Sequence, residues 1–225
     1  ETGNIIIMSN CDALIYEETY DYLFNNCNFG YNFQIGTGAY IYRDLTHEEW
    51  VEAEVYLTKL EELFMTFGKD ILYNIEIKAD GDAPRTKTAD LLVELIEEYD
   101  LQDYVLVATN FEDISLYIIE NYPNIMMSAS HAKAQESILK SYSLTDKFLK
   151  PNGYYALQIP VSYEFPVIKE IDLANKFLVS RIQKHNMAVH YWTINDATTM
   201  RYLISIGANG IITDDPELLM DIITE

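Results

Sequence analysis

Several residue types are scarce in this 225-residue sequence, and each scarcity excludes a class of protein. Only 9 glycines and 6 prolines occur, while 49% of the residues are hydrophobic, so the chain is neither fibrous nor disordered. Basic residues are also few: 15 lysines and arginines stand against 36 acidic residues, which gives a formal net charge of −21. That charge repels polyphosphates and anionic lipids, so we expect no binding to nucleic acid or to a membrane surface.

Cysteines and long apolar runs are scarce too. Cys11 and Cys27 allow one disulfide at most, their spacing fits no metal motif, and the redox compartment stays open. The apolar runs, such as residues 104–108, are far shorter than the roughly 20 residues of a membrane-spanning helix, so we expect no transmembrane segment. The opening Glu-Thr-Gly lacks Met, and we interpret residues 1–3 as an expression scar or a mature terminus, which favours an extracytoplasmic domain.

Strand-like and helix-like segments alternate along the chain, as in repeated βα units. Short β-branched or aromatic runs predict strands at residues 5–8, 32–35, 39–42, 72–78, 104–109, 125–128, 154–159, 189–194 and 210–213. Segments of helical period lie at residues 18–26, 47–67, 88–99, 114–121, 132–141, 168–185, 197–206 and 217–223. The pattern predicts one domain over residues 4–225, an α/β protein with a closed parallel (β/α)8 barrel of the TIM type. An open doubly wound sheet is the alternative.

The strand predicted at residues 72–78 carries polar residues at every second position. Side chains at i and i+2 of a strand share a face, so Asn74, Glu76 and Lys78 project together while Ile75 and Ile77 project to the other side. One interpretation is the solvated face of an edge strand. The other is a buried carboxylate, which requires a partner charge or a metal ion.

Two later segments end in polar turns. Residues 188–195 contain His190 and Trp192, which either line a pocket or pack in the core. Residues 210–216 end in Asp215 and Pro216, the pattern of a helix N-cap followed by proline at the first helical position.

Taken together and in this order, Glu76-Ile-Lys78, Trp192-Thr-Ile-Asn195 and Gly210-Ile-Ile-Thr-Asp resemble motifs of the glycerophosphodiester phosphodiesterases. The resemblance implies a parallel α/β barrel of the phospholipase-C-like type that hydrolyses phosphodiesters with a divalent cation. In that family, carboxylates of Glu-x-Asp and Glu-x-Lys hold the cation, and histidines of His-Arg-Gly and His-Asp act as acid and base. Hard oxygens bind Mg²⁺ or Ca²⁺, and imidazole exchanges protons near neutral pH.

The chain departs from this pattern at the residues that carry the chemistry. In the matching register, the histidine positions hold Ser9 and Arg43, and the Glu-x-Asp positions hold Gln34 and Gly36. Glu76 alone would then remain of the metal ligands, beside the positive charge of Lys78. We therefore expect no metal site, no cofactor and no catalytic residue of the family type; the alternative is an altered but active enzyme that uses Mg²⁺ or Ca²⁺.

The sequence predicts a pseudoenzyme, a binding or structural module on the phosphodiesterase barrel. Its substrate-binding candidates are Lys78, Arg43 and Trp192, and its partner is a small anionic ligand or an unidentified protein. Because consecutive barrel strands are neighbours, we expect Arg43 to reach Glu76, so that an Arg43–Glu76–Lys78 cluster replaces the cation. That cluster is either purely structural or an anion site. His47 is interpreted as part of a helix start, with replacement of a lost catalytic imidazole as the alternative.

Overall fold

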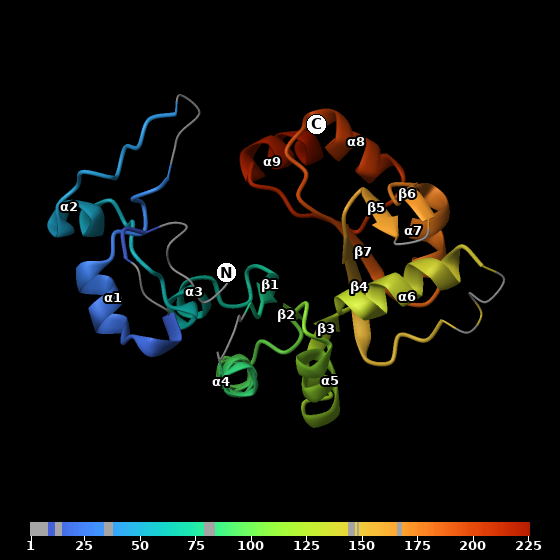
Figure 1. Cartoon of the computed structure of the whole chain (residues 1–225), viewed down its shortest axis with the longest axis horizontal. Coiled ribbons are helices and arrows are strands. Elements are labelled where there is room, and N and C mark those ends of the chain that lie inside the picture. The colour runs from blue at the N-terminus through green and yellow to red at the C-terminus, as the bar shows by residue number, and fades with distance from the viewer. Residues whose placement is uncertain are drawn as a thin grey trace. The chain divides into compact units, whose positions relative to one another are not determined.

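The computed structural model describes residues 9–11, 15–33, 38–78, 84–143, 147, 149–165 and 168–225. Contacts between backbone segments divide the chain into two compact units, Glu1–Tyr104 and Val105–Glu225, and each is described by itself (Figure 1). In the part of the chain described, no helix has both the length and the apolar character needed to cross a membrane. A single domain over residues 4–225 stays a prediction.

The first unit is mainly helical in its described residues. It contains the 3-10 helix η2 (Ile15–Glu17), helices α1 (Tyr20–Asn26), α2 (His47–Glu52), α3 (Leu60–Phe67) and α4 (Arg85–Glu98), and strand β1 (Tyr73–Glu76). Threonine side chains begin two of the helices: Thr19 accepts the backbone N–H of Tyr22, and Thr46 forms a capping box with Glu49. Both caps accept hydrogen bonds from backbone N–H groups that have no partner within the first helical turn.

The second unit is built on a parallel sheet. Its strands lie in the order β2 (Val105–Ala108), β3 (Met126–Ser128), β4 (Tyr154–Ile159), β7 (Ala188–Tyr191) and β8 (Gly210–Ile211). Helices α5 (Glu112–Asn121), α6 (His131–Ser141), α7 (Lys176–Gln183), α8 (Ala197–Ser205) and α9 (Pro216–Thr224) alternate with these strands (Figure 1). Val107, Leu157 and Val189 are fully buried, as expected for strands that helices cover.

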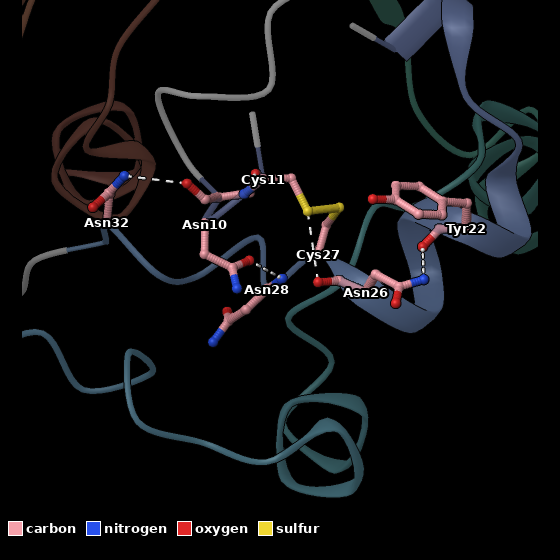
Figure 2. Close-up of a disulfide and its surroundings, with 8 residues drawn as sticks. Asn10, Cys11, Tyr22, Asn26, Cys27, Asn28 and Asn32 are labelled. Carbon is pink, nitrogen blue, oxygen red and sulfur yellow. Dashed lines mark hydrogen bonds between the residues drawn. A yellow bond between two sulfur atoms is a disulfide. The ribbon is translucent and has the colours of Figure 1, made fainter. Parts of the chain in front are cut away.

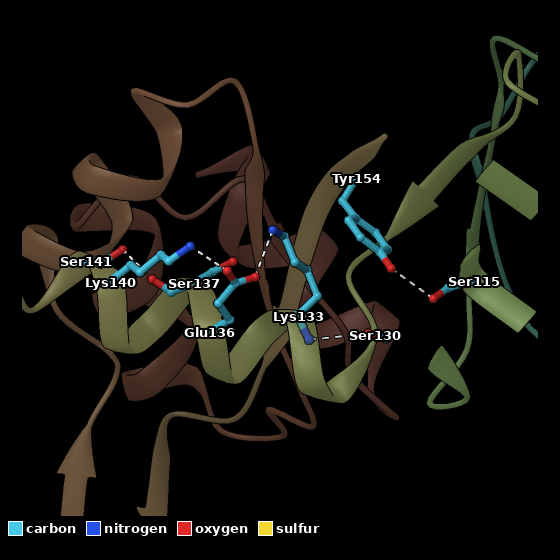
Figure 3. Close-up of polar contacts among 8 residues, drawn as sticks. All are labelled: Ser115, Ser130, Lys133, Glu136, Ser137, Lys140, Ser141 and Tyr154. Carbon is cyan, nitrogen blue, oxygen red and sulfur yellow. Dashed lines mark hydrogen bonds and ion pairs between the residues drawn. The ribbon is translucent and has the colours of Figure 1, made fainter. Parts of the chain in front are cut away.

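Helix α6 carries a charged network beside its buried face (Figure 3). The Lys133 side chain is only 8% exposed, and its Nζ lies 3.0 Å from Glu136 Oε2. Lys140, one turn further on, donates to the other oxygen of the same carboxylate. Hydrogen bonds from Lys140 and then Lys133 hold the pKa of Glu136 below its ordinary value. Glu136 therefore stays ionised and neutralises a lysine that burial would otherwise penalise.

An antiparallel hairpin, β5 (Ser162–Phe165) and β6 (Ile168–Asp172), follows β4. The backbone N–H groups of Leu173 and Ala174 both donate to the carbonyl of Val161 and close its base. The helix predicted over residues 168–185 is therefore wrong in its first half. The β-branched residues Ile168 and Ile171 favour a strand, and α7 begins only after Asn175, whose side chain accepts the backbone N–H of Leu178.

Two predictions for the first unit also need correction. Residues 39–42 form coil and turn rather than a strand, and Tyr40 and Ile41 are largely exposed there, so their β propensity has no sheet to satisfy. The helix predicted over residues 47–67 is two helices, because the chain turns at Glu54, which has φ of 57°. Of the predicted strand at residues 32–35, the described residues 32 and 33 form turn and coil; residues 34–35 and the strand at 5–8 lie outside the described residues.

Candidate functional site

One side chain connects Ser9 and Arg43, the two positions where the resemblance predicts histidines. The Nδ2 of Asn32 donates to the carbonyl oxygen of Ser9 at 3.4 Å, and its Oδ1 accepts from Nη2 of Arg43 at 3.3 Å. Ser9 is buried, and its Oγ accepts the backbone N–H of Cys11 at 3.1 Å. The arrangement is a hydrogen-bond chain that ends in a permanent positive charge, and it contains no group that titrates near neutral pH.

The guanidinium of Arg43 donates hydrogen bonds from one edge and lies against two aromatic rings. Its Nε donates to the carbonyl of Tyr31 at 3.2 Å, beside the Nη2 bond to Asn32. The group lies 3.4 Å from the centroid of the Tyr40 ring and 4.9 Å from that of Tyr31. Within the described ranges, no carboxylate lies within 4.0 Å of this guanidinium. The described partners of Arg43 are thus neutral oxygens and aromatic faces, which orient the charge without cancelling it.

The predicted Arg43–Glu76–Lys78 cluster is wrong in its main contact. Lys78 Nζ does lie 3.4 Å from Glu76 Oε2, but the described residues show no ion pair between Arg43 and Glu76. The physical reason is local: residues 39–42 turn instead of extending, so Arg43 does not end a strand beside β1 and finds Tyr31 and Asn32 instead.

Strand β1 has the alternation that the sequence predicts. Asn74, Glu76 and Lys78 are exposed, whereas Tyr73 and Ile77 are buried, so the shared polar face is confirmed. The side chains of Glu76 and Lys78 are 37% and 41% exposed, and the carboxylate is not buried. The solvated-face interpretation therefore describes this strand better than a buried charge does.

Of the positions where the resemblance implies metal ligands, only Glu76 lies among the described residues. The carboxylate of Glu76 is already paired with Lys78, and Arg43 adds a further positive charge at a position of the family's acid–base pair. In the ranges that the structure describes, no group of three or more His, Cys, Asp or Glu side chains is placed to hold a metal ion. Gln34 and Gly36 lie outside the described residues, so the loss of the metal site stays a prediction.

In the second unit, Asn195 joins the two later motifs. Its Oδ1 accepts from Thr213 Oγ1 at 3.1 Å and from the backbone N–H of Asp214 at 2.9 Å, and its Nδ2 donates to Asp214 Oδ2 at 2.9 Å. Asp215 then caps α9 by accepting the backbone N–H of Leu218, with Pro216 at the start of the helix. The predicted cap is confirmed.

Trp192 and His190 lie at the end of the same strand in different environments. Trp192 is 44% exposed and its backbone N–H donates to Ile159. The ring of His190 packs over Gly210, its partner on β8, where an added Cβ would lie 2.8 Å from Cδ2. Burial lowers the pKa of His190 below its ordinary value and favours the neutral ring. Trp192 offers a surface aromatic, and its ligand-binding role stays a prediction.

His47 belongs to an aromatic cluster of the first unit. Its ring meets Phe24 edge-on at 5.6 Å and Trp50 at 5.3 Å, and it is the first residue of α2, directly after the N-cap Thr46. The helix-start interpretation is therefore confirmed.

Sequence reasoning did not single out the asparagines or decide the disulfide. Cys11 and Cys27 are bonded, with Cα atoms 5.5 Å apart (Figure 2). Asn28 is buried next to this bond: its backbone N–H donates to Asn10 Oδ1, its Nδ2 donates to the carbonyl of Tyr42, and its Oδ1 accepts from Gly30. The concentration of asparagines between residues 25 and 32 was the available signal, since such residues bond to nearby backbone.

Comparison with known proteins places these features in a family. The model of the glycerophosphoryl diester phosphodiesterase family matches residues 35–218, more than half of the chain, and the chain belongs to that family. Its fold is accordingly the α/β TIM barrel of the phosphodiesterase type, with helices alternating with parallel strands as in the described βα units.

Individual relatives agree with this assignment. A glycerophosphodiester phosphodiesterase of Caldanaerobacter subterraneus subsp. tengcongensis is 26% identical over 211 residues, which are 94% of this chain and 79% of that protein. The phosphodiesterase domain of a Mycobacterium tuberculosis protein superposes with a TM-score of 0.73 at 11% identity, over 99% of this chain and 80% of its own. An Oleispira antarctica phosphodiesterase, solved with the product sn-glycerol-3-phosphate, superposes with a TM-score of 0.66 at 17% identity, over 99% of this chain and 77% of its own.

Proposed function

We propose that this member of the family is a binding module that holds a small anion at Arg43 and does not hydrolyse phosphodiesters by the family mechanism. The observation that supports the proposal is the pair of hydrogen bonds by which Asn32 connects Ser9 to Arg43. Where the resemblance places two histidines, the first unit carries a buried hydroxyl and a guanidinium. Neither group accepts and returns a proton near neutral pH, as acid–base catalysis requires.

The expected loss of activity is large. A general acid or base contributes on the order of 10²- to 10⁴-fold to the rate, and both positions have changed. Without a bound metal ion, the charge that develops on the phosphoryl group is not stabilised. The transition state then loses several kcal/mol more of stabilisation. Hydrolysis through Glu76 alone is therefore expected to be negligible.

The anion proposal follows from the edge of the Arg43 guanidinium for which the described residues show no hydrogen-bond acceptor. Its Nε and Nη2 already donate to Tyr31 and Asn32. The opposite edge, formed by Nη1 and the second hydrogen of Nη2, presents two parallel N–H groups. This geometry matches a carboxylate or phosphate, which can accept both bonds at once.

Lys78 and Trp192 enter the proposal in a smaller role. Lys78 Nζ lies 3.4 Å from Glu76 Oε2, and this ion pair leaves little net charge for a ligand. Trp192 belongs to the second unit, and a role for its exposed ring in binding is a separate prediction. Arg43 is thus the residue on which the proposed anion binding depends most.

The test combines turnover with metal binding. Hydrolysis of a glycerophosphodiester and thermal shifts with Ca²⁺ and Mg²⁺ are measured for the wild type and for Glu76→Gln. We expect no turnover and no metal-induced shift in either protein. Metal-dependent turnover that disappears in Glu76→Gln would instead identify an altered but active enzyme.

A restoration variant provides the converse experiment. It combines Ser9→His, Gln34→Glu, Gly36→Asp and Arg43→His, which returns the family's residue types to the matching positions. If the matching register is right, this variant gains a thermal shift with Ca²⁺ or Mg²⁺ that the wild type lacks. A folded variant without any metal response would show that these positions do not face one another.

A further inference from the structure

The disulfide of the first unit joins two hydrogen-bond routes that lead towards Arg43: one reaches the carbonyl of Tyr42, directly before it, and the other reaches its guanidinium. One route begins at Cys27 and the other at Cys11, and the covalent bond joins their starting points (Figure 2). Its consequence concerns the regulation of the proposed anion site, so the inference rests on the proposed function.

The route from Cys27 runs through the residue that follows it. Asn28 is 1% exposed, and its Nδ2 donates to the carbonyl of Tyr42 at 2.7 Å, which fixes the backbone directly before Arg43. Gly30 packs so closely on Tyr42 that an added Cβ would lie 2.8 Å from its Cβ. The segment after Cys27 therefore supports the backbone directly before the arginine.

The route from Cys11 runs through the residues before it. Ser9 accepts the backbone N–H of Cys11 and, through its own carbonyl, a bond from Asn32, which in turn accepts from Arg43. Asn10 lies between them and accepts the backbone N–H of Asn28 at 2.8 Å, which links this route to the first. Through Ser9 and Asn32, the segment before Cys11 thus supports the guanidinium itself.

We propose that the Cys11–Cys27 disulfide controls the affinity of Arg43 for anions. With the bond intact, one route fixes the backbone before Arg43 and the other orients its guanidinium, so that the Nη1–Nη2 edge is preset for a ligand. When the bond is reduced, residues 9–11 keep noncovalent contacts, among them the hydrogen bonds of Asn10 at 2.8 Å and of Asn32 at 3.4 Å, but lose the covalent link to Cys27 that limits their movement. The guanidinium then loses its preset orientation, and a ligand must order it at the expense of affinity.

The redox step requires a dithiol reductant. A thiolate of the reductant attacks one sulfur of the bridge, the second thiol resolves the mixed disulfide, and two electrons and two protons convert the bridge into two thiols while the reductant becomes a disulfide. Cys27 is fully buried, whereas Cys11 is only partly buried. The sulfur of Cys11 is therefore the accessible point of attack. Such a bridge persists in an oxidising compartment and is lost where thiols are kept reduced.

The experiment is a calorimetric titration of the full chain with inorganic phosphate, before and after reduction with excess dithiothreitol. Thiol titration confirms the redox state, and circular dichroism confirms the fold. Loss of one positioning hydrogen bond corresponds to about a fivefold change, so we expect phosphate to bind about five- to tenfold more weakly after reduction. Equal affinity in the two folded states would overturn the inference while leaving the proposed function intact.

Arg43→Ala separates the two claims. If oxidised wild type binds phosphate and Arg43→Ala does not, the anion site is established independently of the redox effect. If oxidised wild type does not bind phosphate at all, the proposed function fails and the inference fails with it.

A second variant decides the matter if reduction unfolds the protein. Asn10→Ala keeps the disulfide but removes the bond to the backbone of Asn28, so phosphate binding should weaken about fivefold in the oxidised state. The matched control is Asn25→Ala: Asn25 donates to the carbonyl of Asp21 within α1, and the described residues show no hydrogen bond between it and either route to Arg43. Unchanged binding in Asn10→Ala, or the same loss in both variants, would overturn the inference.

Discussion

Ser9 and Arg43 contact the same side chain: Asn32 donates to the carbonyl of Ser9 at 3.4 Å and accepts from Nη2 of Arg43 at 3.3 Å. The register predicted from the sequence places the family's acid–base pair at these two positions. In this chain the side-chain amide of Asn32 connects them. It orients the positive charge of Arg43 and offers no group that transfers a proton near neutral pH. The residues that we propose to lack the family's acid–base chemistry thereby include a positive charge with a defined set of partners.

Arg43 is the first residue to test by substitution. Arg43→Ala removes both N–H groups of the open edge and should weaken phosphate binding about 10- to 100-fold, the value of a charge-assisted hydrogen bond. Arg43→Lys keeps the charge but lacks the planar fork, so we expect an intermediate loss. Isothermal titration calorimetry measures both. If Arg43→Lys bound as tightly as wild type, charge alone and not the forked geometry would account for binding.

Gly30 tests how tightly the backbone before Arg43 is packed. In Gly30→Ala the new Cβ would lie 2.3 Å from Val55 Cγ1 and 2.8 Å from Tyr42 Cβ, so the neighbouring segments must move apart. Overpacking of this kind costs about 1–3 kcal/mol. Chemical denaturation gives the free energy of unfolding, which we expect to fall by that amount together with weaker phosphate binding. Wild-type stability would show that Gly30 and Tyr42 are less closely packed.

The fold was predictable where strands and helices carry their own signals. The parallel strands β1–β4 and the cap at Asp215 follow from alternating or continuous apolar runs and from local side-chain bonds. The hairpin β5–β6 was missed because the amphipathic stretch from Ile168 continues into α7 without an evident break. Asn175 was the overlooked signal, since an N-cap marks where that helix begins.

The pH dependence of stability should reveal the network of α6. Lys140 and Lys133 lower the pKa of Glu136 from its ordinary 4.5. A carboxyl whose pKa is lower in the folded state stabilises that state above pH 4.5, and the contribution disappears as the pH falls through the folded pKa. Glu136→Gln should therefore cost about 1–3 kcal/mol at pH 7, because it leaves Lys133 buried without a carboxylate.

Denaturation of wild type and Glu136→Gln at a series of pH values measures this effect. The difference in the free energy of unfolding should be constant above about pH 5 and should shrink towards pH 3. A difference that does not change with pH would mean that the carboxylate of Glu136 contributes by packing and not by its charge.

Asn195 should be essential to the junction between β7 and β8. Asn195→Ala removes hydrogen bonds to Thr213 and to both the backbone and the side chain of Asp214. We expect the free energy of unfolding to fall by about 1–3 kcal/mol. Asn121→Ala, which removes one exposed bond to Tyr117 within α5, is the matched control and should cost less than 1 kcal/mol. Equal losses by thermal denaturation would contradict a role for Asn195 beyond ordinary surface hydrogen bonding.

The candidate site was only partly predictable from the sequence. The shared face of Glu76 and Lys78 followed from the geometry of a strand, and their pairing is found at 3.4 Å. The partner of Arg43 did not follow, because it depends on whether residues 39–42 extend or turn, and their aromatic and β-branched side chains favour a strand in any single-sequence reading. Contacts such as that between Asn32 and Ser9, 23 positions apart, are set by tertiary packing.

Phosphorus NMR of a glycerophosphodiester mixed with the oxidised protein and Mg²⁺ tests the central claim most directly, since it reports binding and hydrolysis in one spectrum. The account predicts that the diester signal shifts or broadens as protein is added, that this change is absent with Arg43→Ala, and that no phosphomonoester signal grows in over hours. A monoester signal that appears only with Mg²⁺ and vanishes in Glu76→Gln would contradict it.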